Sequence, residues 1–224
     1  MVIKYTGHAC FKVRDNETGY SIVFDPYQPD SVRGFGKIVD TASKVLCSHD
    51  HFDHNSAESV QIEPNNADPY EIQVIDTFHD DRKGALRGRN RIHIITDKRT
   101  GERLIHYGDI GEVLDDLLTE ENCKLLLNAD YALIPVGGTY TYDADEALEL
   151  IRRTSPKVAI PMHFKSDTWN FGLEQIGSIE SFMEKAGRQG FNMTVGKVSF
   201  YDTEANDLRD CILVLKPQNA YVPQ

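Results

Sequence analysis

Residues 47–55 read CSHDHFDHN and come directly after a short apolar run that is typical of a β-strand. If the chain leaves that strand still extended, His49 and His51 project to the same side and can bind one ion. A turn at Asp53 would direct its carboxylate and the imidazole of His54 toward a second point nearby. The spacing H-x-H-x-D-H therefore predicts two half-built metal sites side by side. The alternative is a solvated acidic turn that is rich in histidine.

Three further residues are candidates to complete these half-sites, because each follows an apolar segment that reads as a strand. They are His79, Asp109 and His163. Catalytic groups often lie at such strand ends, in loops held by a rigid scaffold. His93 and His106 lie inside predicted strands, where a structural histidine is the expected role. Imidazole and carboxylate ligands without a thiolate suit zinc, iron, manganese or cobalt.

The composition is typical of a globular protein rather than a disordered or membrane-spanning chain. Of the 224 residues, 40% are hydrophobic and 26% charged, and the net charge is -11. An acidic chain disfavours nonspecific binding to nucleic acid. The initial stretch MVIKYTGHACFKV lacks the apolar core of a secretory signal, and no run of ~20 apolar residues predicts a membrane span. We therefore expect a cytoplasmic protein that does not contact membranes.

The cysteines form no C-x-x-C pair, which predicts reduced, structural thiols. They are Cys10, Cys47, Cys123 and Cys211. Cys47 lies two residues before His49, but it ends the apolar run, where a small buried side chain is favoured. The sequence therefore predicts that Cys47 is not a metal ligand.

Short β-rich segments alternate with helix-like segments along most of the chain. The predicted strands are 2–5, 9–13, 20–24, 44–47, 71–78, 91–96, 103–107, 131–136, 157–161, 192–195, 197–201 and 211–215. The predicted helices are 36–42, 113–121, 144–154 and 173–187. At the start of the helix 144–154, Asp143 and Glu146 predict a capping box. The simplest organisation is a single α/β domain over residues 1–224.

The same residues carry a resemblance to a known family. H-x-H-x-D-H, followed by an isolated histidine, Gly-Asp and Pro-x-His, resembles the metallo-β-lactamase superfamily. The motifs that extend this resemblance along nearly the whole chain are GHACF, VFDP, SHDHFDH, FHDD with RGRN, IHYGDIG, IPVGGTYTYDADEA and PKVAIPMHF. Together they look like the branch of metal-dependent hydrolases that includes L-ascorbate-6-phosphate lactonase. The resemblance implies an αββα four-layer sandwich of the α/β class, with the site at one edge of its two sheets.

The resemblance also implies which residues bind each ion. The first metal takes His49, His51 and His79, the second takes Asp53, His54 and His163, and Asp109 bridges both. Two divalent ions per chain are expected, with zinc foremost and manganese or iron as alternatives.

Two such ions would support hydrolysis, because metal binding lowers the pKa of bound water to about 7. The expected reaction is attack by a metal-bound hydroxide on a small lactone, ester or phosphoester. Asp53 and Asp109 are the expected catalytic carboxylates, and Asp53 can also accept a proton from the attacking water. An anionic substrate is expected, because two dications face only two carboxylates.

Two residues upstream of the ligands are candidates for supporting roles. Asp25 is expected to hold a ligand imidazole by its other nitrogen, as metal-bound histidines usually require. The alternative is a turn aspartate before Pro26. His8 either supports the ligands, faces the substrate, or is simply a buried histidine.

Four residues downstream are candidates for contact with the substrate. Tyr140 and Thr141 lie on a glycine-containing loop and are candidates to face the pocket. Arg89, in the RGRN segment that reads as a loop, and Lys165, two residues past His163, are candidates to hold a phosphate or carboxylate. The alternative for both cations is a solvated surface role.

Three other functions compete with the small-molecule hydrolase. A metal-dependent nuclease or phosphodiesterase comes second. Nucleases of this fold commonly have a basic surface that binds the phosphate backbone, and the net charge of this chain is acidic. The third candidate is a di-iron redox protein, which in this superfamily resembles the same scaffold but has an acidic residue where His51 stands. This chain has histidine at that position. A silent binding module would be expected to have lost a ligand. The sequence is compatible with a homo-oligomer.

Overall fold

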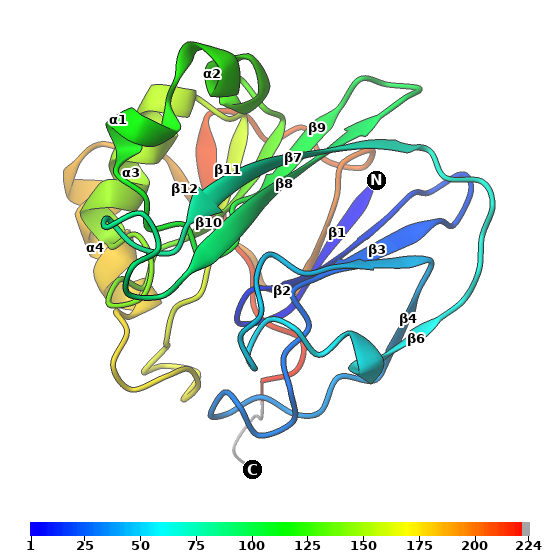
Figure 1. Ribbon diagram of the computed structural model, residues 1–224, viewed down its shortest axis with the longest axis horizontal. Coiled ribbons are helices and arrows are strands. Elements are labelled where there is room, and N and C mark those ends of the chain that lie inside the picture. The colour runs from blue at the N-terminus through cyan, green and yellow to red at the C-terminus, as the bar shows by residue number, and fades with distance from the viewer. Residues whose placement is uncertain (221–224) are drawn as a thin grey trace.

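Two large β-sheets form the framework of the protein (Figure 1). The structure is a computed structural model that describes residues 1–220. The five-stranded sheet has the order β13-β1-β2-β3-β5, with β1 Val2–Gly7, β2 Cys10–Arg14, β3 Ser21–Phe24, β5 Lys44–Leu46 and β13 Phe200–Asp202. The seven-stranded sheet has the order β12-β14-β11-β10-β9-β8-β7, with β7 Tyr70–Phe78, β8 Arg89–Asp97, β9 Arg103–His106, β10 Tyr131–Pro135, β11 Val158–Met162, β12 Met193–Val195 and β14 Cys211–Val214. A separate pair consists of β4 (Asp40–Ala42) and β6 (Val60–Ile62).

The two large sheets pack face to face through aromatic contacts. Phe24 of β3 stacks on His106 of β9 with 5.1 Å between ring centroids, and its centroid lies 6.1 Å from that of His93 on β8. Both nitrogens of His106 are hydrogen-bonded, one to the Ala9 carbonyl and one to the Gly108 N–H. Both histidines are therefore part of the core between the sheets, which is the role expected from their positions inside strands.

The helices gather beside the seven-stranded sheet (Figure 1). They are α1 (Leu114–Leu117), α2 (Glu120–Leu126), α3 (Ala144–Thr154) and α4 (Ile179–Arg188), and a 3-10 turn, η1 (Ala57–Ser59), precedes β6. Parallel strands β10 and β11 are buried along their whole length, as expected for interior strands covered on both faces. In residues 1–220 no helix has the length and apolar character needed to span a bilayer. The predicted α/β class, with facing sheets and helices, is confirmed.

Strand direction brings several loops to one edge of the sandwich. Strands β9, β10 and β11 are parallel, and β7 runs the same way because β8 is antiparallel to both β7 and β9. The residues after β7, β9 and β11 therefore emerge at the same edge, and among them are His79, Asp109 and His163. The segment 47–55 reaches this edge from β5 of the facing sheet.

The helix predicted over residues 36–42 is wrong. Residues 36–39 are irregular and Asp40–Ala42 form β4. The carboxylate of Asp40 accepts hydrogen bonds from the ammonium groups of Lys4 and Lys12, both at 2.7 Å. These contacts with β1 and β2 hold the segment extended, and they join residues that are distant in sequence.

Two other predicted helices have different bounds. The segment 113–121 divides into two helices: α1 ends at Leu117 with Leu118 as its C-cap, and Thr119 caps α2 by accepting the Asn122 N–H. The segment 173–187 becomes helical only at α4, where Ser178 is the N-cap. The predicted RGRN loop is also shorter than expected, since Arg89 is already the first residue of β8.

The predicted capping box at α3 is confirmed, and it yields a test of local stability. The Asp143 carboxylate accepts the N–H groups of Asp145 and Glu146, and the Glu146 carboxylate accepts the Asp143 N–H. We expect Asp143→Ala to lower the free energy of unfolding by about 1 kcal/mol, measured by urea denaturation. Asp143→Asn keeps an acceptor and should lose less. Equal losses in the two variants would contradict a capping role.

Candidate metal centre

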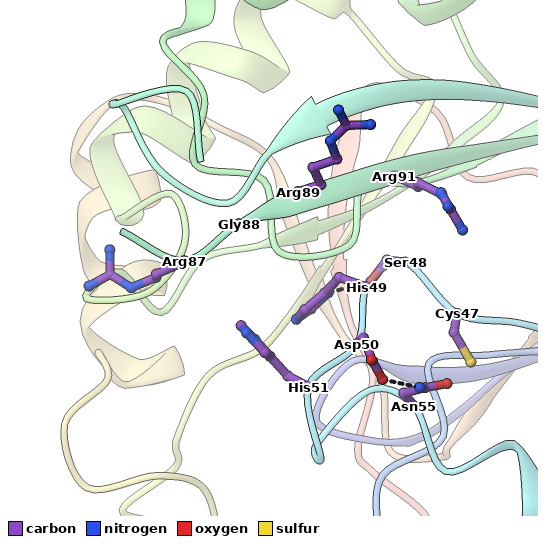
Figure 2. Close-up of a pocket in the computed structure, with 10 residues that line it drawn as sticks. All are labelled: Cys47, Ser48, His49, Asp50, His51, Asn55, Arg87, Gly88, Arg89 and Arg91. Atoms are coloured by element: carbon purple, nitrogen blue, oxygen red, sulfur yellow. Dashed lines mark hydrogen bonds between the residues drawn. The ribbon is translucent and has the colours of Figure 1, made fainter. Parts of the chain in front are cut away.

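The residues predicted to bind the first metal lie together at the shared edge. His49, His51 and His79 each offer a ring nitrogen, and these nitrogens lie within 4.8 Å of one another. Figure 2 shows the side chains of His49 and His51 pointing the same way from the segment after β5. The chain forms bends at residues 48–51 rather than an extended strand, but the centroids of the two rings are still only 4.5 Å apart. Ring centroids of His49 and His79 are 4.7 Å apart, so the third imidazole joins the pair from the opposite sheet.

The residues predicted to bind the second metal form a neighbouring cluster that includes one more histidine. Asp53, His54, His163 and His8 each offer a ligand atom, again within 4.8 Å of one another. His8 Nε2 is hydrogen-bonded to Asp53 Oδ2 at 3.1 Å, and its ring centroid lies 4.2 Å from that of His163. His8 is fully buried, so the structure places it beside the candidate ligands.

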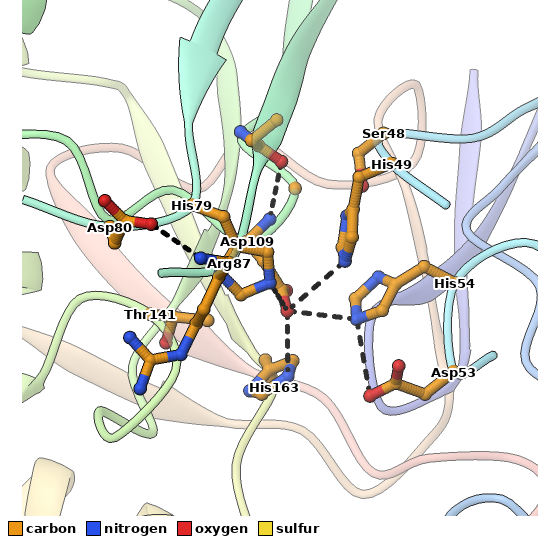
Figure 3. A network of polar contacts seen from close by, with 12 residues as sticks. Ser48, His49, Asp53, His54, His79, Asp80, Arg87, Asp109, Thr141 and His163 are labelled. Carbon is orange, nitrogen blue, oxygen red and sulfur yellow. Dashed lines mark hydrogen bonds and ion pairs between the residues drawn. The ribbon is translucent and has the colours of Figure 1, made fainter. Parts of the chain in front are cut away.

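Asp109 lies between the two clusters (Figure 3). Its Oδ2 atom is 3.1 Å from Nε2 of His79, 3.1 Å from Nε2 of His54 and 3.2 Å from Nε2 of His163. The Nε2 atom of His49 lies 3.9 Å away. One carboxylate oxygen thus faces imidazoles of both clusters, which is the position that a shared ligand requires.

Asp25 and Ser48 determine which nitrogen of two imidazoles carries a lone pair. The buried Asp25 carboxylate accepts hydrogen bonds from the Ser48 hydroxyl at 2.6 Å and from His54 Nδ1 at 2.9 Å. The Ser48 hydroxyl has one proton and gives it to Asp25, so its oxygen accepts from His49 Nδ1 at 2.9 Å. His49 and His54 therefore both present an unprotonated Nε2 toward Asp109 when they are neutral. Ser48 was not singled out from the sequence.

A second support holds Asp109 through its backbone. Its N–H donates to Oδ1 of Asn90 at 2.9 Å, and the Asn90 amide donates to the carbonyl of Tyr107 and the hydroxyl of Thr77. Gly108 has φ +57°, and a Cβ there would lie 2.3 Å from Asn90 Oδ1. Only glycine lets the chain approach Asn90 so closely, so the strand end and Asn90 together direct the Asp109 carboxylate into the cluster.

The backbone at this edge adopts conformations that L-residues rarely use. His8, Asp25 and His163 have φ of 56°, 43° and 52°. Such left-handed conformations cost on the order of 1–3 kcal/mol each and persist where surrounding contacts hold them. The His163 N–H donates to the His8 carbonyl at 2.9 Å, and the Tyr5 hydroxyl donates to the same carbonyl. These contacts link the first strand to the end of β11.

The protonation states of His49 and Asp109 suit a metal ion, whereas that of His54 would change when a metal binds. Burial, aided by the neighbouring His54, lowers the pKa of His49 to about 3, so that ring is neutral. Burial alone would raise the pKa of Asp109, but the charges of His163 and His54 hold it well below its usual range. Burial would likewise lower the pKa of His54, but the charge of Asp109 raises it well above its ordinary value. Metal binding at His54 would therefore release a proton.

The donor atoms fit divalent metal ions. Within residues 1–220, His49 Nε2, His54 Nε2 and Asp109 Oδ1 are buried and make no hydrogen bond. Buried polar atoms without hydrogen bonds are costly, and both of these nitrogens face the neighbouring Asp109 carboxylate, so the three atoms together indicate a ligand that would satisfy them. Nitrogen and oxygen donors without a thiolate suit zinc, manganese or iron. The cluster is therefore a candidate His/Asp metal site.

A cavity of about 450 Å³ opens onto this cluster. Its lining combines five of the candidate ligands with Phe52, Leu173 and Tyr140, and with one cationic side chain, Arg87. A second cavity of about 380 Å³ adjoins it, shares His51 and Arg87 with it, and extends along the start of β8 (Figure 2).

The predicted substrate-contacting residues have different positions. Tyr140 lines the cavity at the cluster, whereas Arg89 lines only the adjoining one. Thr141 is buried and donates to the carbonyl of Tyr142. The structure does not bring Lys165 to the cluster: its ammonium donates to the Glu174 carbonyl and borders a separate depression. Arg87, which lines both cavities, was missed because spacing along the chain does not show which arginine of RGRN points inward.

Facing sheets with a cluster of imidazole and carboxylate groups at one edge define a protein with the metallo-β-lactamase fold and a candidate metal centre. The family described as the beta-lactamase superfamily domain matches residues 2–163, and the chain belongs to that superfamily.

Similar proteins agree with this assignment. A UPF0173 metal-dependent hydrolase of Methanocaldococcus jannaschii is 26% identical, over 88% of this chain and 97% of the relative. A second protein of that name, from Carboxydothermus hydrogenoformans, is 25% identical, over 80% of this chain and 91% of the relative. Among solved structures, a candidate zinc-dependent hydrolase of the metallo-β-lactamase superfamily from Thermotoga maritima has a TM-score of 0.69 and 25% identity, covering 97% of this chain and 99% of that one.

The structure also allows a test of the prediction for Cys47. This thiol lines the adjoining cavity but belongs to none of the His/Asp clusters in residues 1–220, and burial raises its pKa to about 12. We expect Cys47→Ala to keep the metal content of the unmodified protein, as should the matched control Cys123→Ala, both measured by elemental analysis. A selective loss of metal in Cys47→Ala, with an unchanged circular-dichroism spectrum, would identify its thiolate as a ligand.

Proposed function

We infer that the protein is a metal-dependent hydrolase, and we propose that it holds two divalent ions. The first would be bound by His49, His51 and His79, the second by Asp53, His54 and His163, with Asp109 shared. The observation that carries this proposal is the position of Asp109 Oδ2, within 3.2 Å of imidazole nitrogens from both clusters. A carboxylate in that position would serve as a ligand shared by both ions. Zinc is the ion proposed first, with manganese or iron as alternatives.

Bound ions of this class lower the pKa of water and polarise the oxygen of an ester, lactone or phosphoester. The protein's own residues supply the orientation that this chemistry requires. Asp25 and Ser48 direct two Nε2 lone pairs inward, and the Asn90 amide fixes the backbone of Asp109. Asp53 lines the cavity and is held by His8, so its carboxylate is placed to accept a proton from an attacking water.

We further propose that the substrate is small and anionic. A cavity of about 450 Å³ accommodates a small molecule, in the range typical of ligand pockets. Two dications that face two carboxylates leave excess positive charge inside a chain of net charge -11. Such a site attracts small anions, whereas the acidic surface repels a long polyanion such as RNA. A phosphorylated lactone, as in the lactonase that the sequence resembles, meets these requirements.

The two-ion proposal predicts the metal content of the protein. Protein purified without chelator and supplemented with zinc should contain about two ions per chain, measured by elemental analysis. Removal with a chelator should abolish ester or lactone hydrolysis, and added zinc should restore it. A content below about one ion per chain after supplementation would contradict the proposal.

The shared role of Asp109 predicts an unequal effect of ligand mutations. Asp109→Ala should lower metal content at both sites and reduce kcat/KM more than His51→Ala or His163→Ala, because each histidine serves one ion. The loss should exceed the roughly 10- to 100-fold that removal of an outer hydrogen-bond partner costs. Full metal content and activity in Asp109→Ala would show that this residue is misassigned.

A further inference from the structure

We propose that Arg87, supported by Tyr140, is the specificity-determining residue of this site and binds the anionic group of the substrate. The proposal rests on the proposed function and names the subsite that would select the substrate. The ligand chemistry is a carboxylate or phosphate at one end of a small molecule whose scissile group lies at the metal cluster.

The position of Arg87 at the cavity is the first argument. Among residues 1–220 it is the one lysine or arginine that lines the cavity together with His79, Asp109 and His163. Its side chain is half-buried, and in the described part of the chain its guanidinium has no carboxylate partner. The guanidinium carbon lies 5.4 Å from the ring centroid of Tyr140. A cation held against an aromatic ring, with its donors unused, is ready to bind an anion.

The loop that carries Arg87 is held rigidly relative to the metal cluster. The buried Asp80 carboxylate accepts four backbone N–H groups, those of Arg82, Gly84, Leu86 and Arg87, at 2.8 to 3.0 Å. The acceptor sites of Asp80 are thus used by backbone N–H groups within the loop, and in the described residues no ion pair joins this carboxylate to the Arg87 guanidinium. Preorganised donors bind anions without the entropy cost of ordering a flexible side chain.

The two ends of this loop are joined next to a candidate ligand. The His79 N–H donates to the Gly88 carbonyl at 3.1 Å, and the Gly88 N–H donates to the Gly84 carbonyl at 2.9 Å. Gly84 has φ +78°, and a Cβ there would lie 2.7 Å from the Gly88 carbonyl oxygen. Arg87 is therefore placed by the same strand end that places His79.

Tyr140 is anchored near the other side of the cluster. The N–H of Tyr142 donates to the carbonyl of Ile110 at 2.9 Å, directly after Asp109. The neighbouring Thr139 has φ +63°, and its hydroxyl donates to the Gln175 carbonyl at 2.8 Å. The loop that carries Tyr140 is thus hydrogen-bonded to the segment that follows Asp109. Arg87 and Tyr140 are therefore both held by segments that also carry candidate ligands.

The other arginines nearby do not share this position. Arg87, Arg89 and Arg91 follow one another along the start of β8, but Figure 2 shows their side chains pointing in different directions. Arg89 and Arg91 line only the adjoining cavity, which Arg87 and Asp50 line as well, and Arg91 lies 3.6 Å from Asp76. Of these three arginines, Arg87 is the one that also lines the cavity at the metal cluster.

The rest of the cavity defines the middle of the ligand. Phe52, which is 57% exposed, and Leu173 add apolar surface to the lining of this cavity. A planar guanidinium binds a carboxylate or phosphate through two parallel hydrogen bonds. The ligand class is therefore a small molecule with an apolar or ring portion, one anionic end at Arg87 and an acyl or phosphoryl group at the metal cluster.

The test is a binding measurement that does not depend on turnover. Zinc-loaded protein of verified metal content is titrated calorimetrically with straight-chain dicarboxylates from succinate to pimelate, and with monocarboxylates of equal carbon number. One carboxylate can occupy the metal cluster and the second can reach Arg87. At one chain length the dicarboxylate should bind about 10- to 100-fold more tightly, as expected for a hydrogen-bonded charge.

Variants separate the subsite from a general charge effect. Arg87→Gln should remove the preference for the dicarboxylate and leave the affinity for the monocarboxylate unchanged, and Arg87→Lys should keep part of it. The control Arg209→Gln removes the same charge from an exposed residue that pairs with Asp207, and it should keep the preference. The same ratio should appear in kcat/KM for 4-nitrophenyl hydrogen succinate against 4-nitrophenyl methyl succinate.

Three results would overturn the assignment of Arg87. They are the absence of a dicarboxylate preference at every chain length, its survival in Arg87→Gln, and its equal loss in Arg89→Gln or Arg209→Gln. Failure of the proposed function is detected separately, because a protein that binds no zinc would fail the check of metal content before the titration and would hydrolyse neither ester.

Discussion

The buried carboxylate of Asp109 is the constraint on which the rest of the site depends. A charged group removed from water is strongly destabilising unless opposite charge or hydrogen bonds surround it. Four imidazole nitrogens lie within 3.9 Å of one of its oxygens, and its backbone N–H is held by Asn90. The ends of β5, β7, β9 and β11 all contribute to this environment. The two sheets must therefore pack in register at this edge for the charge to be stable.

Contacts next to the cluster stabilise a second buried carboxylate and a strained stretch of backbone. Asp25 is buried as well, and its charge is balanced by the Ser48 hydroxyl, the Ser48 N–H and His54. The left-handed backbone at His8 and His163 is strained, but the two residues are joined by a hydrogen bond and by contact between their rings. The apolar core between the sheets, including the stack of Phe24 on His106, stabilises these conformations.

Charge is distributed unevenly, and the distribution has consequences for selectivity. The chain as a whole is acidic, yet Arg87, Arg89 and Arg91 lie at the start of β8 beside the cluster. With the proposed ions bound, the site would carry positive charge within an acidic chain, a distribution that would favour small anions over long polyanions. The loop organised by Asp80 places Arg87 at the cavity of the cluster, whereas Arg89 and Arg91 of β8 line only the adjoining cavity.

Much of this arrangement could be predicted from the sequence, because it depends on local spacing. H-x-H-x-D-H after a strand predicts that two imidazoles lie on one side of the chain, and apolar runs mark the strands that end before His79, Asp109 and His163. The capping box at Asp143 is equally local, since its partners lie within three residues. The helix predicted at 36–42 failed because contacts from Lys4 and Lys12 hold Asp40 in an extended segment.

The sequence by itself thus determined the fold class, the kinds of candidate ligand and the strand ends that carry them. Only the tertiary structure decided which other side chains reach the cluster. It placed Ser48, Asn90 and Arg87 beside the ligands and left Lys165 against the Glu174 carbonyl, although Lys165 follows His163 by only two residues. The physical reason is that these contacts join segments from different strands, and their geometry depends on how the two sheets pack rather than on spacing along the chain.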